Sequence, residues 1–132
     1  MIDSYKELIV WQKSIELVKQ IYKSLETLPS SELYILGSQM KRAAISVPSN
    51  IAEGYKRKNL GEYVQFLSIA DASSAELETQ IIIAKDLYKN TDFRQAEALL
   101  VEVQKMLYAL LKKLKTNSKQ LYPKPSTLNP TI

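Results

Sequence analysis

The two side-chain types that most often carry catalysis and metal binding are missing from this sequence, which has no histidine and no cysteine. Without histidine there is no Ser-His pair and no Glu-x-x-His ligand set of the kind that holds two metal ions inside a helical bundle. Without cysteine there is no disulfide framework and no thiolate metal site. We therefore expect no enzyme activity, no catalytic residue, no cofactor and no metal site.

Carboxylates remain as candidates for acid-base chemistry, but their spacing is unfavourable. Glu76 and Glu78 are two positions apart, so on a helix they point about 200° apart. Asp71 and Glu78 share a helix face but are separated by about 10 Å along the axis, which is too far for one shared metal ion. A site assembled from different helices stays open at this stage.

The charged residues are segregated along the chain, whose net charge is +4. A first block has five bases and one acid, a second block (residues 62–86) has five acids and one base, and a third (residues 112–124) has five lysines. Segregated blocks indicate faces with different partners. The five bases of the first block are Lys41, Arg42, Lys56, Arg57 and Lys58.

Apolar residues recur at alternating intervals of three and four, which predicts long amphipathic helices. In the first helix this stripe is Leu8, Trp11, Ile15, Val18, Tyr22 and Leu25. We expect helices at about residues 7–27, 32–56, 60–89 and 92–116. Short connections then favour an antiparallel, up-and-down four-helix bundle, an all-α domain over residues 1–116.

Two local signals refine this expectation. Asn59, followed by Glu62, resembles a capping box that opens the third helix, and Ser30 or Ser31 is a candidate N-cap for the second. Pro48 removes a backbone donor inside the second helix, so we expect a kink near it. Residues 117–132 contain Pro123, Pro125 and Pro130 and are expected to be a flexible tail or a partner-binding arm.

The predicted third and fourth helices carry more apolar residues than one core stripe requires. These residues fit either a wide core-facing stripe or a second face buried against copies of the same chain. The sequence shows neither an apolar leader nor an uncharged span of 18 residues, so we expect a cytoplasmic protein without a membrane segment. The surplus residues are Ile69, Ile82, Ile83, Leu87, Leu99, Met106 and Leu111.

Residues 40–60 differ from the rest of the chain, since Pro48, Asn50 and Gly54 each weaken a helix there. Such local violations concentrate at functional or strained places. The string GSQMKRAAISVPSNIAEGYKRKN, with the opening LIVWQKSIELVKQIY and the later FLSIADASSAELETQIIIAKDL, resembles the 23S rRNA intervening-sequence protein family. The resemblance runs from about Tyr5 to Lys112, and Pro48, Asn50, Glu53 and Gly54 belong to its signature.

The resemblance implies a four-helix bundle that assembles as a homopentamer and has no established enzymatic activity. It also implies a likeness to the accessory protein of diversity-generating retroelements, which binds nucleic acid and a reverse transcriptase. Two departures stand out: Lys41 replaces a usual arginine, and Asp71-Ala72 replaces a common arginine-glycine pair. The second departure makes the third helix more acidic and weakens any nucleic-acid contact there.

Two functions follow as hypotheses. The first is an oligomer that binds structured RNA, or DNA, through the five bases of the first block, with Tyr55 available to stack on a base. The alternative is a protein-binding scaffold for a partner enzyme such as a reverse transcriptase. These residues also have structural explanations: Lys41 and Arg42 as solvated or ion-paired groups, and Lys56, Arg57 and Lys58 as bases favoured at a helix C-terminus. Glu53 is explained as an i,i+4 partner of Arg57, and Asn50 as a donor to backbone groups freed by Pro48.

Overall fold

The computed structural model describes residues 3–121, with side chains described as far as Thr116. Every regular element in this range is helical, and four of the helices are long, which confirms the predicted all-α four-helix bundle. The elements are the 3₁₀ turn η1 (Tyr5–Glu7), α1 (Ile9–Leu25), α2 (Ser30–Glu32), the π-helical turn η2 (Leu33–Gly37), α3 (Ser38–Tyr55), α4 (Leu60–Leu87) and α5 (Arg94–Leu121).

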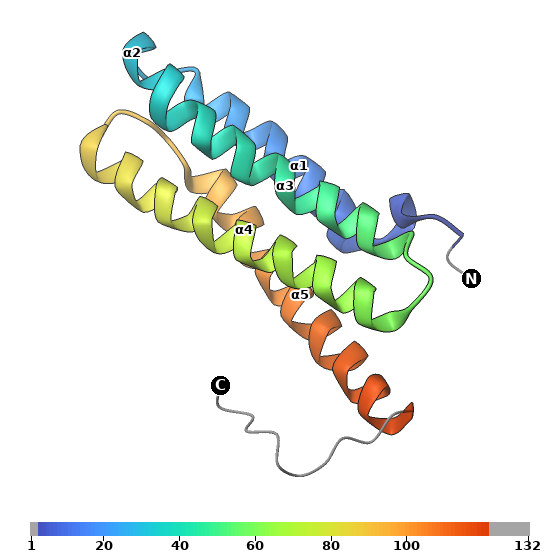
Figure 1. Ribbon diagram of the computed structural model, residues 1–132. Coiled ribbons are helices and arrows are strands. Elements are labelled where there is room, and N and C mark those ends of the chain that lie inside the picture. Colours follow the sequence, from blue (N-terminus) through green and yellow to red (C-terminus); the bar gives the residue numbers. More distant parts are fainter. Residues whose placement is uncertain (1–2, 122–132) are drawn as a thin grey trace.

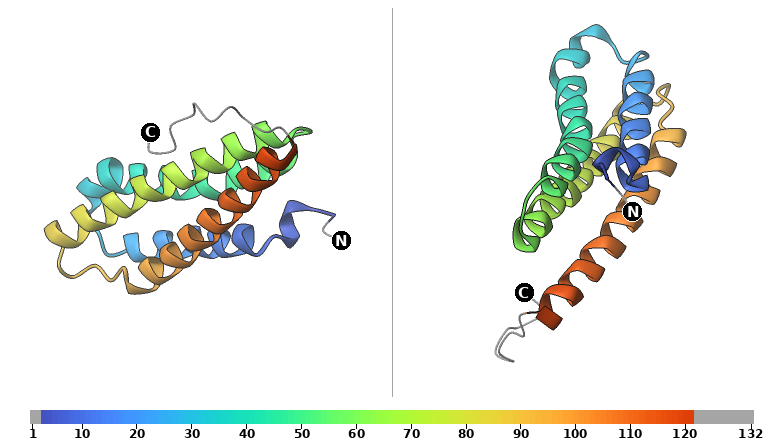
Figure 2. Two further views of the ribbon diagram at one scale, coloured as in Figure 1. Left: turned by 90° about the horizontal axis from the view of Figure 1, so that it is seen from below. Right: turned by 90° about the vertical axis from the view of Figure 1, so that its right-hand side faces the viewer.

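The four long helices alternate in direction along the bundle (Figure 1). Helix α1 packs against α3 and α5, and α4 packs against the same two helices from the other side. Figure 2 shows that α5 crosses obliquely and that its last turns lead away from the other helices. No helix in the described range combines the length and the apolar character needed to cross a membrane.

Two differences from the predicted elements are larger than a shift of two residues at a helix end. The second predicted helix begins as α2 and passes through the π turn η2 before becoming α3, and no side chain caps its start, where Pro29 takes the N-cap position. The last helix continues to Leu121 and includes five residues that the prediction assigned to the tail. The reason is that the first helix-breaking residue after Arg94 is Pro123. The rest of the predicted tail lies outside the described residues.

Pro48 lies inside α3, which is helical on both sides of it. Its side chain is buried. The kink that we expect near this residue stays a prediction.

The core stripe of α1 is not the one that the spacing indicated. The buried residues of this helix are Val10, Ser14, Leu17, Ile21 and Leu25. Of the predicted stripe only Leu25 is buried, whereas Trp11 and Val18 lie partly buried at its edge and Tyr22 is exposed. The helix carries two adjacent apolar stripes, and intervals of three and four fit both of them. Trp11, Ile15 and Val18 of the predicted stripe instead line a groove beside α3.

Helices α3 and α4 approach each other closely because small residues line their contact. Gly54 is buried, and a Cβ added to it would lie 2.8 Å from the Phe66 Cβ and 3.1 Å from the Tyr63 Cδ1. Farther along, the Ser46 and Ser73 hydroxyls are 2.7 Å apart across the same contact. Interaxial distance depends on the side chains at the contact, so these residues set the spacing of the two helices.

Replacing Gly54 with alanine tests this close approach. Alanine favours a helix by about 1 kcal/mol over glycine, but here its methyl group would overlap Phe66, so we expect a net loss of roughly 1–2 kcal/mol in the free energy of unfolding. Gly61→Ala is the matched control, because only the Asn59 Oδ1 lies near its added Cβ, at 3.6 Å. Chemical denaturation measures both, and a Gly54→Ala protein as stable as Gly61→Ala would contradict the assignment.

Candidate nucleic-acid interface

The five bases of the first block form two clusters at opposite ends of α3. Lys41 and Arg42 lie near its start, and Lys56–Lys58 lie at and after its end. Arg42 and Lys56 are fourteen positions apart, which corresponds to about 21 Å along the axis. The structure therefore does not bring all five bases into one compact patch.

Arg42 and Lys56 nevertheless share one face of α3. Positions seven apart on a helix are offset by only about 20°, so Arg42, Ser49 and Lys56 form a line along the outward side. All three are exposed. Lys58, just beyond the helix end, is also exposed. Arg42, Lys56 and Lys58 form no ion pair with any described residue, so these three bases are available to an external anion.

Lys41 and Arg57 have partners within the chain. The Lys41 ammonium lies 4.7 Å from the ring centroid of Tyr22 on α1. The Arg57 guanidinium lies 4.7 Å from the Phe66 centroid, and its Nη2 is 3.5 Å from the Glu53 Oε1, which is the i,i+4 pair expected from the sequence. Cation–π contacts at exposed sites contribute about 0.5–1 kcal/mol. These two bases are thus less available than Arg42, Lys56 and Lys58.

Tyr55 packs against its own chain and not outward among the bases. Its ring meets that of Tyr63 edge to face, with the centroids 6.1 Å apart. Burial is the main cause that raises the pKa of Tyr63, and the neighbouring Tyr55 raises it further. A ring in this position serves the α3–α4 contact, so the described geometry gives no support to base stacking by Tyr55.

Asn50 has a structural role, with a different acceptor from the one expected. Its Nδ2 donates to the Ser46 carbonyl oxygen at 2.8 Å and to the Ser46 Oγ at 2.9 Å. The carbonyl that Pro48 leaves without its usual donor is that of Ala44, four residues before the proline. Asn50 thus joins the serine pair that links α3 to α4. Sequence reasoning missed this network, although a serine four residues before an asparagine is a readable signal.

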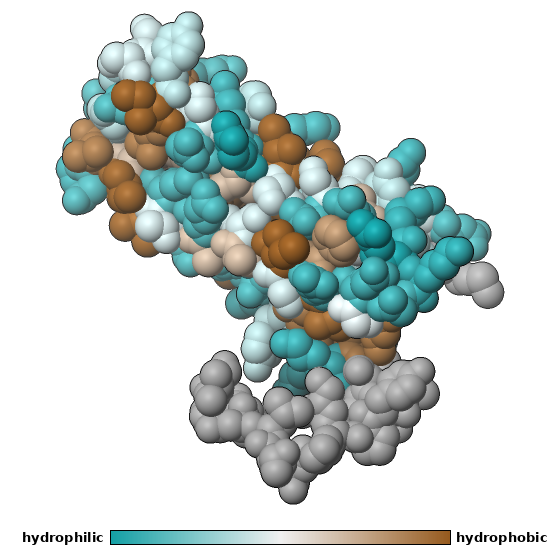
Figure 3. Space-filling view, viewed as in Figure 1, coloured by the Kyte–Doolittle hydropathy of each residue, from teal (hydrophilic) through white to brown (hydrophobic). Residues whose placement is uncertain are grey.

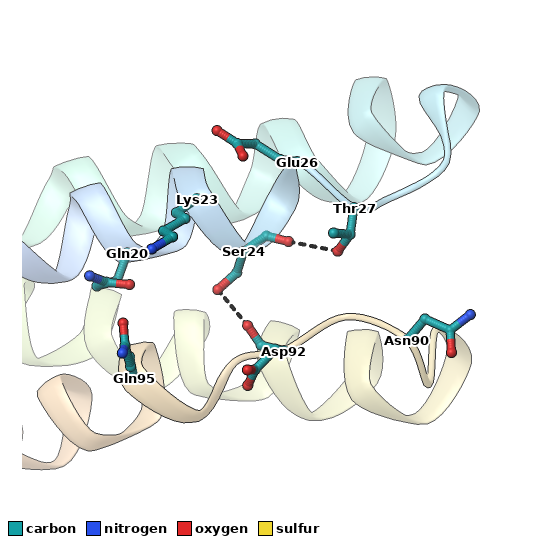
Figure 4. Close-up of a pocket in the computed structure, with 8 residues that line it drawn as sticks. All are labelled: Gln20, Lys23, Ser24, Glu26, Thr27, Asn90, Asp92 and Gln95. Atoms are coloured by element: carbon teal, nitrogen blue, oxygen red, sulfur yellow. Dashed lines mark hydrogen bonds between the residues drawn. The ribbon is translucent and has the colours of Figure 1, made fainter.

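A polar hollow of about 310 Å³ lies between the end of α1 and the α4–α5 connection (Figure 4). The Ser24 hydroxyl donates to the Asp92 carbonyl oxygen at 2.7 Å. The Asp92 carboxylate accepts hydrogen bonds from the Arg94 side chain and from its backbone N–H, which lowers the pKa of Asp92 to about 2. These bonds hold the connection in place, so we assign the hollow a structural role.

The exposed carboxylates do not converge. Asp71 and Glu78 are exposed on α4, and no group of three acidic residues placed to hold a metal ion occurs within the described residues. The described side chains therefore offer cationic and apolar surfaces as their candidates for binding.

A substitution at Asn50 separates its structural role from ligand binding. We expect Asn50→Ala to lower the free energy of unfolding by roughly 1–2 kcal/mol, because part-buried groups at Ser46 lose their donor. Any affinity for RNA should be unchanged by this substitution. Gln39→Ala, at an exposed position near the start of α3 and outside the line of Arg42, Ser49 and Lys56, is the control and should change neither quantity. Loss of RNA affinity in a folded Asn50→Ala protein would show that Asn50 contacts the ligand.

Comparison with known proteins gives one family. No curated protein matches the chain. The family model described as 23S rRNA-intervening sequence protein matches residues 6–109, which include the last two residues of η1, all of α1, α3 and α4, and more than half of α5. The matched range contains most of the helical bundle, both basic clusters, and the motif of residues 37–59 on which the resemblance rests. The chain therefore belongs to the 23S rRNA-intervening sequence protein family.

Proposed function

We propose that this protein is a non-catalytic, self-associating helical bundle that binds the phosphate backbone of structured RNA through the outward face of α3. The observation that carries the proposal is the line formed by Arg42 and Lys56, with Lys58 beyond it, exposed and without an ion-pair partner among the described residues. Lys41 and Arg57 lie at the margins of this line and supply weaker contacts.

Phosphate contacts fit this surface better than base contacts do. Arginine and lysine bind phosphate oxygens without regard to sequence. Tyr55, the aromatic residue that directly precedes the second basic cluster in the sequence, packs on Tyr63. A few cations per chain bind weakly, but an oligomer repeats them, and a pentamer would present five copies to one folded RNA. Self-association is supported by the exposed apolar side chains of α4, which include Ile82 and Leu87.

Service as a scaffold for a partner enzyme is the second proposal. The same exposed apolar residues of α4 favour it, since a large exposed apolar patch typically marks a protein-binding surface. Capture of a reverse transcriptase by the purified oligomer, abolished by Leu87→Lys, would support this alternative.

Charge reversal tests the RNA proposal. In the double variant Arg42→Glu, Lys56→Glu we expect the affinity for an RNA hairpin to fall at least tenfold and the slope of log K against log salt to shrink by roughly 2. The double variant Lys112→Glu, Lys113→Glu carries the same change in net charge on exposed residues of α5. It should retain most of the affinity. Fluorescence anisotropy over a potassium chloride series provides both quantities.

Two results would contradict the proposal. One is the absence of hairpin binding by the unsubstituted protein at low salt. The other is an equal loss in the two double variants, which would indicate a response to net charge alone. Tighter binding of duplex DNA than of the RNA hairpin would identify DNA as the ligand, bound through the same phosphate contacts.

A further inference from the structure

Helix α4 carries large apolar side chains on the side that faces away from the core. Ile82 is 62% exposed and Leu87 is 63% exposed, with Ile69 and Ile83 above 40%. Helical spacing places a row of smaller exposed residues between them. A helix with apolar residues all round its circumference is normally covered on every side. The small residues of this row are Ser68, Ala72, Ala75 and Thr79.

The surplus apolar residues were expected either to widen the core-facing stripe or to form a second face, and the structure shows some of each. Those of α5, which are Leu99, Met106 and Leu111, are buried or packed against the core and widen its stripe. Those of α4 remain outside the core. Figure 3 shows apolar surface gathered at the end of the molecule where η2 and the last turns of α4 lie.

Acidic residues border this outward face of α4. Asp71, Glu76 and Glu78 are exposed, and none of them forms an ion pair with a described base. Because the three carboxylates lie on both flanks of the small-residue row, two α4 helices packed together through this face would oppose like charges. A symmetric α4–α4 contact is therefore unfavourable, and the preferred partner surface is apolar with a basic rim.

A surface of that description lies between α1 and α3 of the same chain. A shallow groove of about 240 Å³ is lined by the second apolar stripe of α1 together with residues of α3 and η1. The Tyr5 ring meets Trp11 edge to face at 5.4 Å and forms one end of the groove. Besides Tyr5, the apolar residues that line the groove are Trp11, Ile15, Val18, Ile45 and Pro48.

Lysines border this groove. Lys41 leans over Tyr22 on α1, and Lys19, four residues after Ile15, is exposed on the same side of α1. Ile45, 43% exposed, lies beside them at the centre of α3. Between Lys19 and Lys41 the groove therefore has an apolar floor and a cationic edge, which is the complement of the outward face of α4.

We propose that the outward face of α4 of one copy packs into the α1–α3 groove of a second copy. The small residues Ala72 and Ala75 let the helix approach closely, Ile82 and Ile83 cover the apolar floor, and Asp71 and Glu78 meet the lysines of the cationic edge. The assignment rests on the self-association included in the proposed function and specifies its two surfaces. Ser49, which lines the groove, lies between Arg42 and Lys56 on α3, so the RNA-binding face borders this contact. Lys56 and Lys58 lie beyond the groove, at and after the end of α3, and stay available to RNA.

The two surfaces lie on different sides of the bundle, since α4 contacts α3 and α5 while the groove lies between α1 and α3. Each copy then uses its α4 face toward one neighbour and its groove toward the other. Such a heterologous contact builds a ring if the rotation closes and a chain if it does not.

Mixing two variants tests this arrangement. Ile45→Lys disables the groove and Ile82→Lys disables the α4 face, both at exposed positions where lysine suits a helix. Ile9→Lys, at an exposed residue outside both surfaces, is the control. Circular dichroism and thermal melting check that each variant folds, and sedimentation at micromolar concentration measures the mass.

We expect each single variant to sediment as a monomer and Ile9→Lys to keep the mass of the unsubstituted oligomer. An equimolar mixture of Ile45→Lys and Ile82→Lys should give a species of twice the monomer mass, because one intact α4 face then meets one intact groove. Folded single variants that keep the full mass, or a mixture that stays monomeric, would overturn the assignment of surfaces. A monomeric unsubstituted protein would instead overturn self-association itself.

Discussion

The close contact between α3 and α4 fixes the position of most other parts of the molecule. At Gly54 the two helices leave no room for a methyl group, and at Ser46 and Ser73 they are joined by a hydroxyl pair within hydrogen-bonding distance. A short interaxial distance brings the ends of the two helices together, so Tyr55 packs on Tyr63 and Arg57 reaches Phe66. It also determines which side of α3 is left for solvent, and that side carries Arg42 and Lys56.

This contact explains why residues that weaken an isolated helix are grouped in α3. Glycine lowers the stability of a helix interior by about 1 kcal/mol relative to alanine, but at position 54 it removes a steric overlap. Asn50 is a weak helix former whose side chain here supports the serine pair. The local costs are offset by packing with α4, so the same residues that mark the family also build the bundle.

The number, order and direction of the helices could be predicted from the sequence because apolar periodicity and short connections constrain them strongly. In α3, α4 and α5 the intervals of three and four run through residues that the structure buries, including Leu77 and Val103. The stripe of α1 was wrong because that helix has two apolar faces, and spacing alone does not tell which one faces inward. Ser14, which is buried, made the true stripe look less apolar than the flank that contains Trp11.

The candidate site was less predictable than the fold. Sequence order shows five bases in one block, but helix geometry separates the two basic clusters by several turns. The aromatic residues that contact Lys41 and Arg57 come from α1 and α4. Tyr22 and Phe66 each lie in a different predicted helix from the base that they contact. Such pairings depend on interhelical register, which periodicity does not provide.

The π turn at Leu33–Gly37 has a consequence for how this region tolerates changes in length. A π turn contains one residue more than the corresponding α-helical turn, so it behaves as an insertion that the helix has absorbed locally. Loss of one residue elsewhere in a helix rotates all following side chains by about 100° relative to those before. Loss of one residue between positions 33 and 37 would instead restore regular α-helical winding and leave Met40, Ala43 and Val47 in phase with the core. Family members that differ by one residue in length are therefore expected to differ here.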